Sequence, residues 1–283
     1  MEGTRTRAIG TAERSGVLLP RNLERFSARW IPPADDVRDV VDTYWAVHWR
    51  LEPGESIDQR IIDHPSITLS IERGDVIAPL VMTSAQSTAW TRTISGSGEV
   101  FAIRLRPAGL AVLSDLEASS LPHEQEVTAD LDGRSHRLLA QIASAPDPTA
   151  RAEIADTLVR ALLAERSLKP SQRLANAALD VIADQPHVRR TSDVAAALGV
   201  GVRTLQRAVH THVGRGPGEL ARRVRLQEVV RRLSTAHGSL ADIAVELGYV
   251  DQAHLTNDFR AVAGMTPGAY LRAVAQANQK LTG

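Results

Sequence analysis

Eight polar side chains in the last third of the chain fall on two short helical faces. They are Arg203, Gln206, Arg207, His210, Gln252, His254, Thr256 and Asn257. Apolar residues recur between them at helical spacing, as with Leu205 and Val209, so the polar side chains occupy the opposite faces. Arg can bond guanine O6 and N7 together, and Gln or Asn can do the same at adenine N6 and N7. The two faces therefore predict contacts to base edges in duplex DNA.

Two similar helix-turn-helix patterns carry these faces, at residues 191–207 and 239–259. In the first, a short helix with small alanines ends at Gly199, which can adopt the left-handed conformation of a tight turn. In the second, Asp251 is a natural N-cap for the following helix. The segment 217–233 predicts one connecting helix of about 25 Å, suited to holding two recognition helices ~34 Å apart, one turn of B-DNA.

An ordered set of short motifs runs through both patterns. It comprises LGV at 198–200, RTLQR at 203–207, Gly214, Pro217, Arg225-Leu226, DIA at 242–244, LGY at 247–249, Asp251-Gln252, Phe259-Arg260 and GMTP at 264–267. With these motifs the sequence resembles the AraC/XylS family of regulators over residues 172–275. The resemblance implies an all-α DNA-binding domain with two helix-turn-helix units. Three residues depart from the family pattern: Gly201 stands where Ser is usual, Val209 where Phe is common and Asn257 where Arg is frequent.

The two halves of the chain carry opposite charge. Residues 168–283 contain 15 Lys and Arg against 9 Asp and Glu, a balance of +6, and the upstream residues carry −6, so the whole chain is neutral. This asymmetry fits a DNA-binding module fused to a module that does not bind DNA. Within the basic half, Arg203 and Arg207 charge the first face, whereas Asp258 adjoins the second. We expect the first unit to specify its half-site more sharply.

Short segments with alternating apolar residues predict strands in the N-terminal half, at 44–49, 67–71 and 100–105. Clusters of Pro, Gly and Asp separate these segments, as in an antiparallel β domain. Further along, the apolar spacing becomes helical and predicts helices at 131–145 and 148–165. The N-terminal domain is therefore predicted to be β-rich with two helices at its end.

The same region resembles the β-rich sensory domain of one subgroup of the AraC/XylS family. The similar motifs are WIPP at 30–33, the aromatic run at 44–49, RLRPAG at 104–109 and DLDG at 130–133. This resemblance implies a cupin-like barrel for effector sensing or self-association. The predicted fold is α+β and multidomain, with an N-terminal antiparallel β-barrel, cupin-like and with helices, and a C-terminal all-α double helix-turn-helix domain.

Composition and proline placement divide the chain. Residues 1–20 lack periodicity and are rich in Gly, Thr and Arg, which is typical of a flexible arm. The stretch 167–171 contains Pro170, which disfavours helix in the residue before it, and predicts a linker. The sensory or dimerisation domain then spans 21–166 and the DNA-binding domain 172–283. We expect the part of the chain from the linker onward to fold alone.

Tryptophan is confined to the N-terminal half of the chain. Trp45, Trp49 and Trp90 are candidates for lining an effector pocket. Arg104 is a candidate polar anchor, because strand alternation places it opposite the apolar Ile103. The alternative is that the tryptophans only fill the core of the domain.

No residue set for catalysis, metal binding or cofactor binding stands out. The chain has no Cys, which excludes disulfides, thiolate metal sites and the reactive-cysteine repair of alkylated DNA that some family members perform. His210 and His212 lie two apart on a helix and point in different directions, while His48 and His64 lack a clustered carboxylate. Phosphate-loop, dinucleotide and nucleophile motifs are absent. We predict a non-enzyme without metal or cofactor, with a cupin-like enzyme as the alternative.

The predicted function is transcription regulation through sequence-specific binding to double-stranded DNA, controlled by a small-molecule effector in the N-terminal domain. The absence of Cys and of an apolar run of about 18 residues predicts a cytoplasmic protein with no membrane partner. RNA polymerase and a second copy of the chain are further candidate partners. Leu158, Leu162 and Leu163 could supply the apolar seam of a homodimer. There are two alternatives. One is a constitutive dimeric regulator whose N-terminal domain only mediates association, and the other is a protein-interaction module that does not bind DNA. Activation and repression of transcription are both open.

Overall fold

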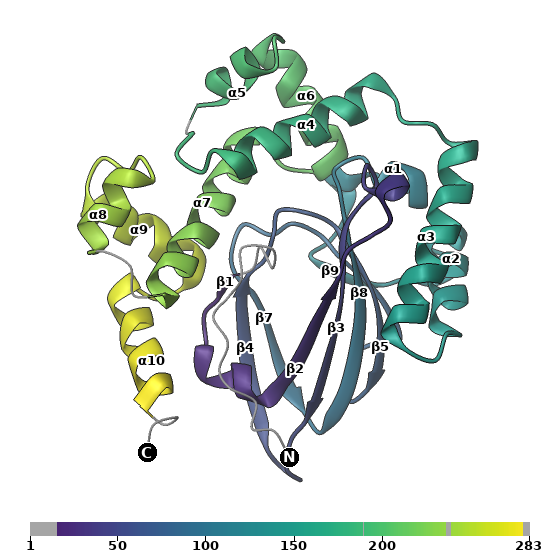
Figure 1. Ribbon diagram of the computed structural model, residues 1–283, viewed down its shortest axis with the longest axis horizontal. Coiled ribbons are helices and arrows are strands. Elements are labelled where there is room, and N and C mark those ends of the chain that lie inside the picture. Colours follow the sequence, from purple (N-terminus) through teal and green to yellow (C-terminus); the bar gives the residue numbers. More distant parts are fainter. Residues whose placement is uncertain (1–15, 189, 236–238, 280–283) are drawn as a thin grey trace.

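Two antiparallel sheets form the N-terminal half of the protein, in a computed structural model that describes residues 16–188, 190–235 and 239–279 (Figure 1). The large sheet has the strand order β2-β3-β8-β5-β6-β9, and the small sheet has the order β1-β4-β7. The strands of the large sheet are β2 (Phe26–Ile31), β3 (Val41–Arg50), β5 (Thr68–Gly74), β6 (Leu80–Thr83), β8 (Ser97–Leu105) and β9 (Glu124–Glu126). The strands of the small sheet are β1 (Gly16–Val17), β4 (Ser56–Ile62) and β7 (Trp90–Ser95).

The two sheets are separate, so the predicted closed barrel is wrong. No backbone pairing joins a described strand of one sheet to a described strand of the other. The chain instead passes from one sheet to the other, as at 63–67 between β4 and β5 and at 84–89 between β6 and β7. The predicted strands themselves coincide with β3, β5 and β8 to within a few residues. Alternation gives the two faces of a strand but not its neighbours, and so it cannot distinguish a barrel from two facing sheets.

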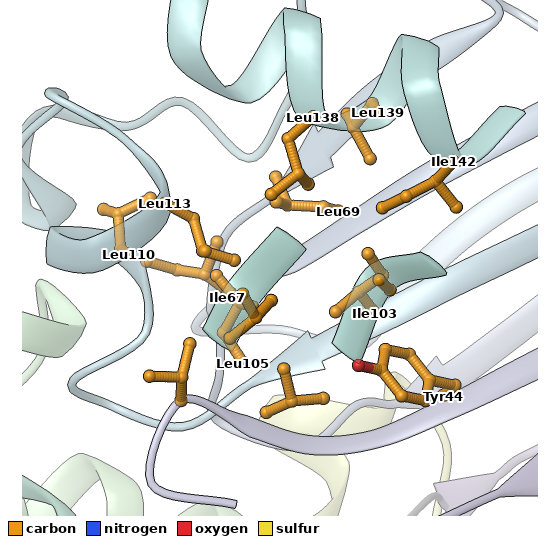
Figure 2. Close-up of a cluster of buried hydrophobic side chains, with 14 of the residues drawn as sticks. Tyr44, Ile67, Leu69, Ile103, Leu105, Leu110, Leu113, Leu138, Leu139 and Ile142 are labelled. Carbon is orange, nitrogen blue, oxygen red and sulfur yellow. The ribbon is translucent and has the colours of Figure 1, made fainter. Parts of the chain in front are cut away.

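One face of the large sheet is covered by helices (Figure 2). These helices are α1 (Leu110–Leu113), α2 (Gly133–Ala143) and α3 (Pro148–Glu165). On β8, Ile103 and Leu105 point into this core, whereas Ala102 and Arg104 line a cavity on the opposite face. Strand alternation therefore gives the large sheet one face that packs against the helices and one face that lines the cavity.

Helix α3 completes the same core. The Tyr44 hydroxyl donates to Asp156 Oδ1 at 2.7 Å and so ties β3 to α3. Leu158, Leu162 and Leu163 pack against the core and are partly buried there. They therefore contribute to the interior of the chain, and the homodimer stays a prediction.

The C-terminal half is helical. Its helices are α4 (Pro170–Asp184), α5 (Thr191–Ala197), α6 (Val202–Val213), α7 (Pro217–Ser234), α8 (Leu240–Glu246), α9 (Gln252–Ala263) and α10 (Pro267–Gln279). Three short 3-10 helices, η2 (Pro20–Arg25), η3 (Asp35–Val37) and η4 (Ala118–Ser120), lie in the N-terminal half. Helix α7 ends one residue beyond its prediction. None of the described helices is long and apolar enough to cross a membrane.

The predicted flexible arm extends too far along the chain. Residues 1–15 of the predicted arm lie outside the described residues, but Gly16 and Val17 form β1 and pair with β4. The folded part of the chain therefore begins before residue 21. The predicted linker 167–171 falls between the end of α3 and the first turn of α4.

Candidate nucleic-acid interface and effector cavity

Helices α5 and α6 form the first helix-turn-helix unit. Gly199 follows α5 with φ +64°, the left-handed conformation predicted for the turn. Leu205 and Val209 are fully buried beneath α6. The four predicted contact residues of this unit, Arg203, Gln206, Arg207 and His210, are all exposed. The first polar face is thus exposed to solvent.

Helices α8 and α9 form the second unit. The Asp251 carboxylate accepts a hydrogen bond from the His254 backbone N–H at 2.7 Å, so Asp251 caps α9 as predicted. Gln252, His254 and Asn257 are exposed, while Thr256 is half-buried. The second polar face is therefore also present, with Thr256 at its margin.

The two units repeat with a spacing of 50 residues. Helices α6 and α9 each have 12 residues, and each ends at a left-handed glycine, Gly214 with φ +76° and Gly264 with φ +69°. This register makes Arg260 the equivalent of His210, and Arg260 is exposed. The contact residues expected from the sequence do not include Arg260, because they were chosen on each face without aligning the two units. The paired glycines give the correct alignment.

The helical half also matches known proteins. Residues 194–273 match a family described as a helix-turn-helix domain, and residues 29–126 match a domain of unknown function (DUF6597). A protein of Streptomyces antibioticus named as an AraC-like transcription regulator is 34% identical over 87 residues, and one of Streptomyces lividans is 35% identical over 79 residues. The C-terminal part of this chain is an AraC-type helix-turn-helix domain.

The similarity covers a limited part of each protein. The matched segments make up 31% and 28% of this chain and 29% and 26% of the two relatives, so the chain spans less than a third of their length. Among solved structures, ToxT from Vibrio cholerae is 11% identical across 89% of this chain and 98% of its own, with a TM-score of 0.39. The C-terminal domain of AraT, a response regulator from Geobacillus stearothermophilus, is 22% identical across 38% of this chain and 87% of its own, with a TM-score of 0.35.

Asp258 of the AraC-type domain is turned away from the predicted contact face. Its carboxylate accepts a hydrogen bond from Arg222 Nε at 2.5 Å and another from the Tyr249 hydroxyl at 2.9 Å. Burial raises the pKa of Tyr249, and the charge of Asp258 raises it further, so the hydroxyl remains a donor. Asp258 therefore fixes α9 to α7 instead of repelling a phosphate backbone.

The arginines of α7 mostly serve the structure of the AraC-type domain. Arg225 donates to the carbonyl oxygens of Pro186 and Val188, both at 3.2 Å, which attaches α7 to the segment before α5. Arg231 and Arg232 both donate to Glu228, at 2.6 and 2.7 Å. Arg203 and Arg207 of α6 and Arg260 of α9 remain exposed.

A cavity of about 1060 Å³ lies between the two sheets and is lined by residues of both. It includes all four residues predicted for an effector site: Trp45, Trp49, Trp90 and Arg104. The Arg104 guanidinium lies 5.9 Å from the centre of the Trp45 ring and donates to Asp42 at 2.6 Å. The structure thus brings these side chains to one space, although they come from β3, β7 and β8.

Trp49 and Trp90 play different parts in the wall of this cavity. Trp49 is buried, and its indole N–H donates to the Ser95 carbonyl at 3.0 Å, which ties β3 to the end of β7. Its ring covers Gly98, where any Cβ would overlap it. Trp90 is half-buried and donates to Glu124 at 3.1 Å. Trp49 is therefore a core residue that also lines the cavity, and an effector in this cavity stays a prediction.

The cavity wall also contains a charged group that sequence reasoning missed. Arg92 of β7 pairs with Glu72 at 2.8 Å and with Glu124 at 2.9 Å. Ser70 Oγ donates to the same Glu72 at 2.9 Å. Glu72 and Arg92 are 20 residues apart and belong to different sheets, so no local pattern could pair them. Together with the aromatic side chains, they make the cavity both apolar and charged.

Among the described residues, no three His, Cys, Asp or Glu side chains lie close enough together to hold a metal ion.

Proposed function

We propose that this chain is a sequence-specific DNA-binding transcription regulator whose DNA affinity is controlled by a small molecule held between the two sheets. One observation carries the DNA-binding part. Helices α6 and α9 have equal length, end at equivalent glycines and present polar faces outward, and the single helix α7 joins their units. Two such helices can enter successive major grooves on one side of a duplex.

Selection from random duplex DNA with the full-length chain tests this proposal. We expect enriched sequences with two short half-sites about 10 base pairs apart, one for each unit. Binding should weaken with salt, with a log–log slope of about −4 or steeper, because phosphate contacts release counterions. Arg207→Ala should weaken the enrichment at one or two base pairs of one half-site. Arg272→Ala, which removes an exposed charge from α10, is the matched control and should leave both half-sites in place. The absence of any enriched sequence would refute DNA recognition.

The effector part rests on the cavity and its mixed lining. A volume of about 1060 Å³ is sufficient for a drug-sized molecule, and cavities of this kind combine apolar walls with a few placed polar groups. A metabolite panel should contain compounds that raise the melting temperature and change the tryptophan fluorescence of the full chain, since Trp45 and Trp90 line the cavity. If no compound does so, the alternative of a regulator whose N-terminal half only mediates association is favoured.

A further inference from the structure

The first unit of the AraC-type domain is attached to the large sheet. Asn176 of α4 accepts a hydrogen bond from the Ala108 N–H at 2.9 Å and donates to the Asp39 carbonyl at 2.8 Å. Asp180 accepts two hydrogen bonds from Arg106, at 2.5 and 2.7 Å. Residues 39, 106 and 108 adjoin the ends of β3 and β8. Helix α4 is therefore fixed to two central strands of the large sheet.

Helix α6 is attached to the same side. Gly214, at its C-terminal end, lies against Ala118 of η4, so closely that a Cβ at this position would overlap the Ala118 carbonyl. Arg215 donates to the Ala85 carbonyl at 3.1 Å, just after β6 of the large sheet. The hydrophobic core of this unit draws only on residues from α4 to α7. The first unit is thus self-contained and sits on the large sheet.

The second unit instead shares its core with the small sheet. One hydrophobic cluster joins Val17, Leu18, Ile62, Ala89, Leu226, Val229, Val230, Leu233, Ile243, Ala244, Leu247, Tyr249, Leu255, Phe259, Val262, Ala263 and Tyr270. The first four of these belong to the small sheet or adjoin it, and the rest belong to α7, to the helices beyond it or to the turn between α8 and α9. The Ala89 N–H donates to the Val262 carbonyl at 2.9 Å. The second unit is therefore packed on the small sheet.

Strand β4 carries the cavity on one side and the second unit on the other. Gln59 lines the cavity. Its neighbour Arg60 donates to the Ala263 carbonyl at the end of α9, at 3.3 Å. Ile62, two residues further, is fully buried in the shared cluster, and its carbonyl accepts from Gln227 of α7 at 3.0 Å. A displacement of β4 at the cavity reaches α9 without any intermediate element.

Arg223 joins the connecting helix to both segments that pass between the sheets. It is buried, and its Nε donates to the Asp63 carbonyl at 2.7 Å, while it also forms an ion pair with the Asp63 carboxylate. Its Nη1 donates to the carbonyl oxygens of Gln86 and Thr88 at 2.8 and 3.1 Å. Burial lowers the pKa of Arg223 to about 10, so it keeps its charge at neutral pH. Helix α7 is thus attached at its middle to the 63–67 and 84–89 crossovers.

We infer that the distance between the two sheets sets the relative placement of the two recognition helices. Each sheet holds one unit, and the cavity separates the sheets. A molecule that bridges the cavity favours one sheet separation and hence one separation of α6 and α9, which must match the spacing of successive major grooves. The effect on DNA binding rests on the proposed function. The coupling between the separation of the sheets and the placement of α6 and α9 does not depend on DNA.

The coupling can be tested by fixing the sheet separation directly in the full chain, which has no cysteine of its own. Gln59→Cys on the small sheet and Ala102→Cys on the large sheet place two thiols in the cavity wall. Short and long bifunctional thiol reagents then hold the sheets at two separations. Ketone-bearing amino acids at Thr211 and Ala261, exposed and equivalent on α6 and α9, carry spin labels. The distance between the labels should differ by about 2 Å or more between the two reagents, the scale of helix shifts at interfaces.

A label pair within one unit is the control. Labels at Ser192 and Thr211, both exposed in the first unit, should keep the same distance with either reagent. Equal distances between α6 and α9 with both reagents, in chains shown by mass to be cross-linked, would overturn the inference. Gln59→Cys with Val47→Cys, which lies on the same face of β3 as Trp45, is the second pair if the first does not react. The measurement uses no DNA, so its failure leaves the proposed DNA binding intact, and a failure of DNA selection leaves the coupling intact.

Discussion

Arg222 of the connecting helix and Asp258 of the second recognition helix are joined by a hydrogen bond of 2.5 Å. The carboxylate also accepts from Tyr249, and its side chain is only 12% exposed. Asp258→Ala should lower the free energy of unfolding by about 1–3 kcal/mol, because the buried Tyr249 hydroxyl loses its acceptor. Chemical denaturation measures this cost, with the exposed Asp184→Ala as the control. An equal effect of the two substitutions would show that the Asp258 contacts contribute no stability.

The two recognition helices should contribute unequally to sequence specificity. Arg207 can bond a guanine in bidentate fashion, whereas Asn257 offers a neutral amide at the equivalent position. Arg207→Ala should therefore cost ~1–3 kcal/mol of binding and relax specificity at one or two base pairs. Both variants can be titrated against all single-base changes of the selected operator. A larger loss from Asn257→Ala would reverse this order of the two units.

Arg260 should contribute through charge. Because it lies near the C-terminal end of α9, at the position equivalent to His210, we expect a contact to the phosphate backbone. Arg260→Ala should weaken binding to all operator variants to a similar degree and reduce the magnitude of the salt slope by about 1. Arg272→Ala removes the same charge from α10 and should leave the slope unchanged. Loss of preference at a single base pair would instead assign Arg260 to base recognition.

Three left-handed glycines should respond differently to alanine. A Cβ added at Gly199 meets no neighbouring atom. Gly199→Ala should therefore lower the free energy of unfolding only by the strain of the left-handed conformation, about 1–2 kcal/mol. Gly264→Ala adds a close approach to the Arg60 side chain, which can move. Gly214→Ala overlaps the Ala118 carbonyl, so we expect the largest loss of stability there. Similar melting temperatures for Gly199→Ala and Gly214→Ala would show that α6 is not pressed against η4.

Acid should weaken the AraC-type domain through Glu228. Burial raises the pKa of Glu228, but the hydrogen bonds from Arg231 and Arg232 outweigh it and hold the pKa below its ordinary value. A lowered pKa in the folded state means that the stabilisation is complete above the ordinary value of 4.5 and is lost as the pH falls through the lowered value. The free energy of unfolding should fall between pH 6 and pH 3, which lie on either side of about 4.5. This fall should be smaller in Glu228→Gln than in the unchanged chain. Glu153→Gln, exposed on α3, is the control and should keep the full loss.

The helical half could be predicted from sequence in detail because its signals are local. Gly199 and Asp251 mark helix ends through backbone conformation and capping, and each acts within a few residues of its position. Leu205 and Val209 set the buried face of α6 in the same local way. The exposed positions of the polar residues follow from these, while their contacts with DNA remain predictions.

The rest of the fold depends on contacts that join distant parts of the sequence. Alternation placed Arg104 on the cavity side of β8, but it could not show that β7 and β8 belong to different sheets. The same limit hid the pairing of Glu72 with Arg92. Arg222 lies in a run of basic residues, and only the packing of α7 against α9 shows that it binds Asp258.

One hydrophobic cluster joins Ile62 and Ala89 to the helices of the second unit. The predicted linker at 167–171 therefore does not separate two parts of the chain that fold independently. A chain cut at the linker would leave the apolar partners of these residues in water, so the part from the linker onward lacks a piece of its own core. The small sheet and the second unit should therefore melt as a single cooperative block, while the first unit retains a core of its own. Exchange of helical halves between relatives would succeed only where the incoming half fits the side chains at 17, 18, 62 and 89, which restricts how freely such regulators can be recombined.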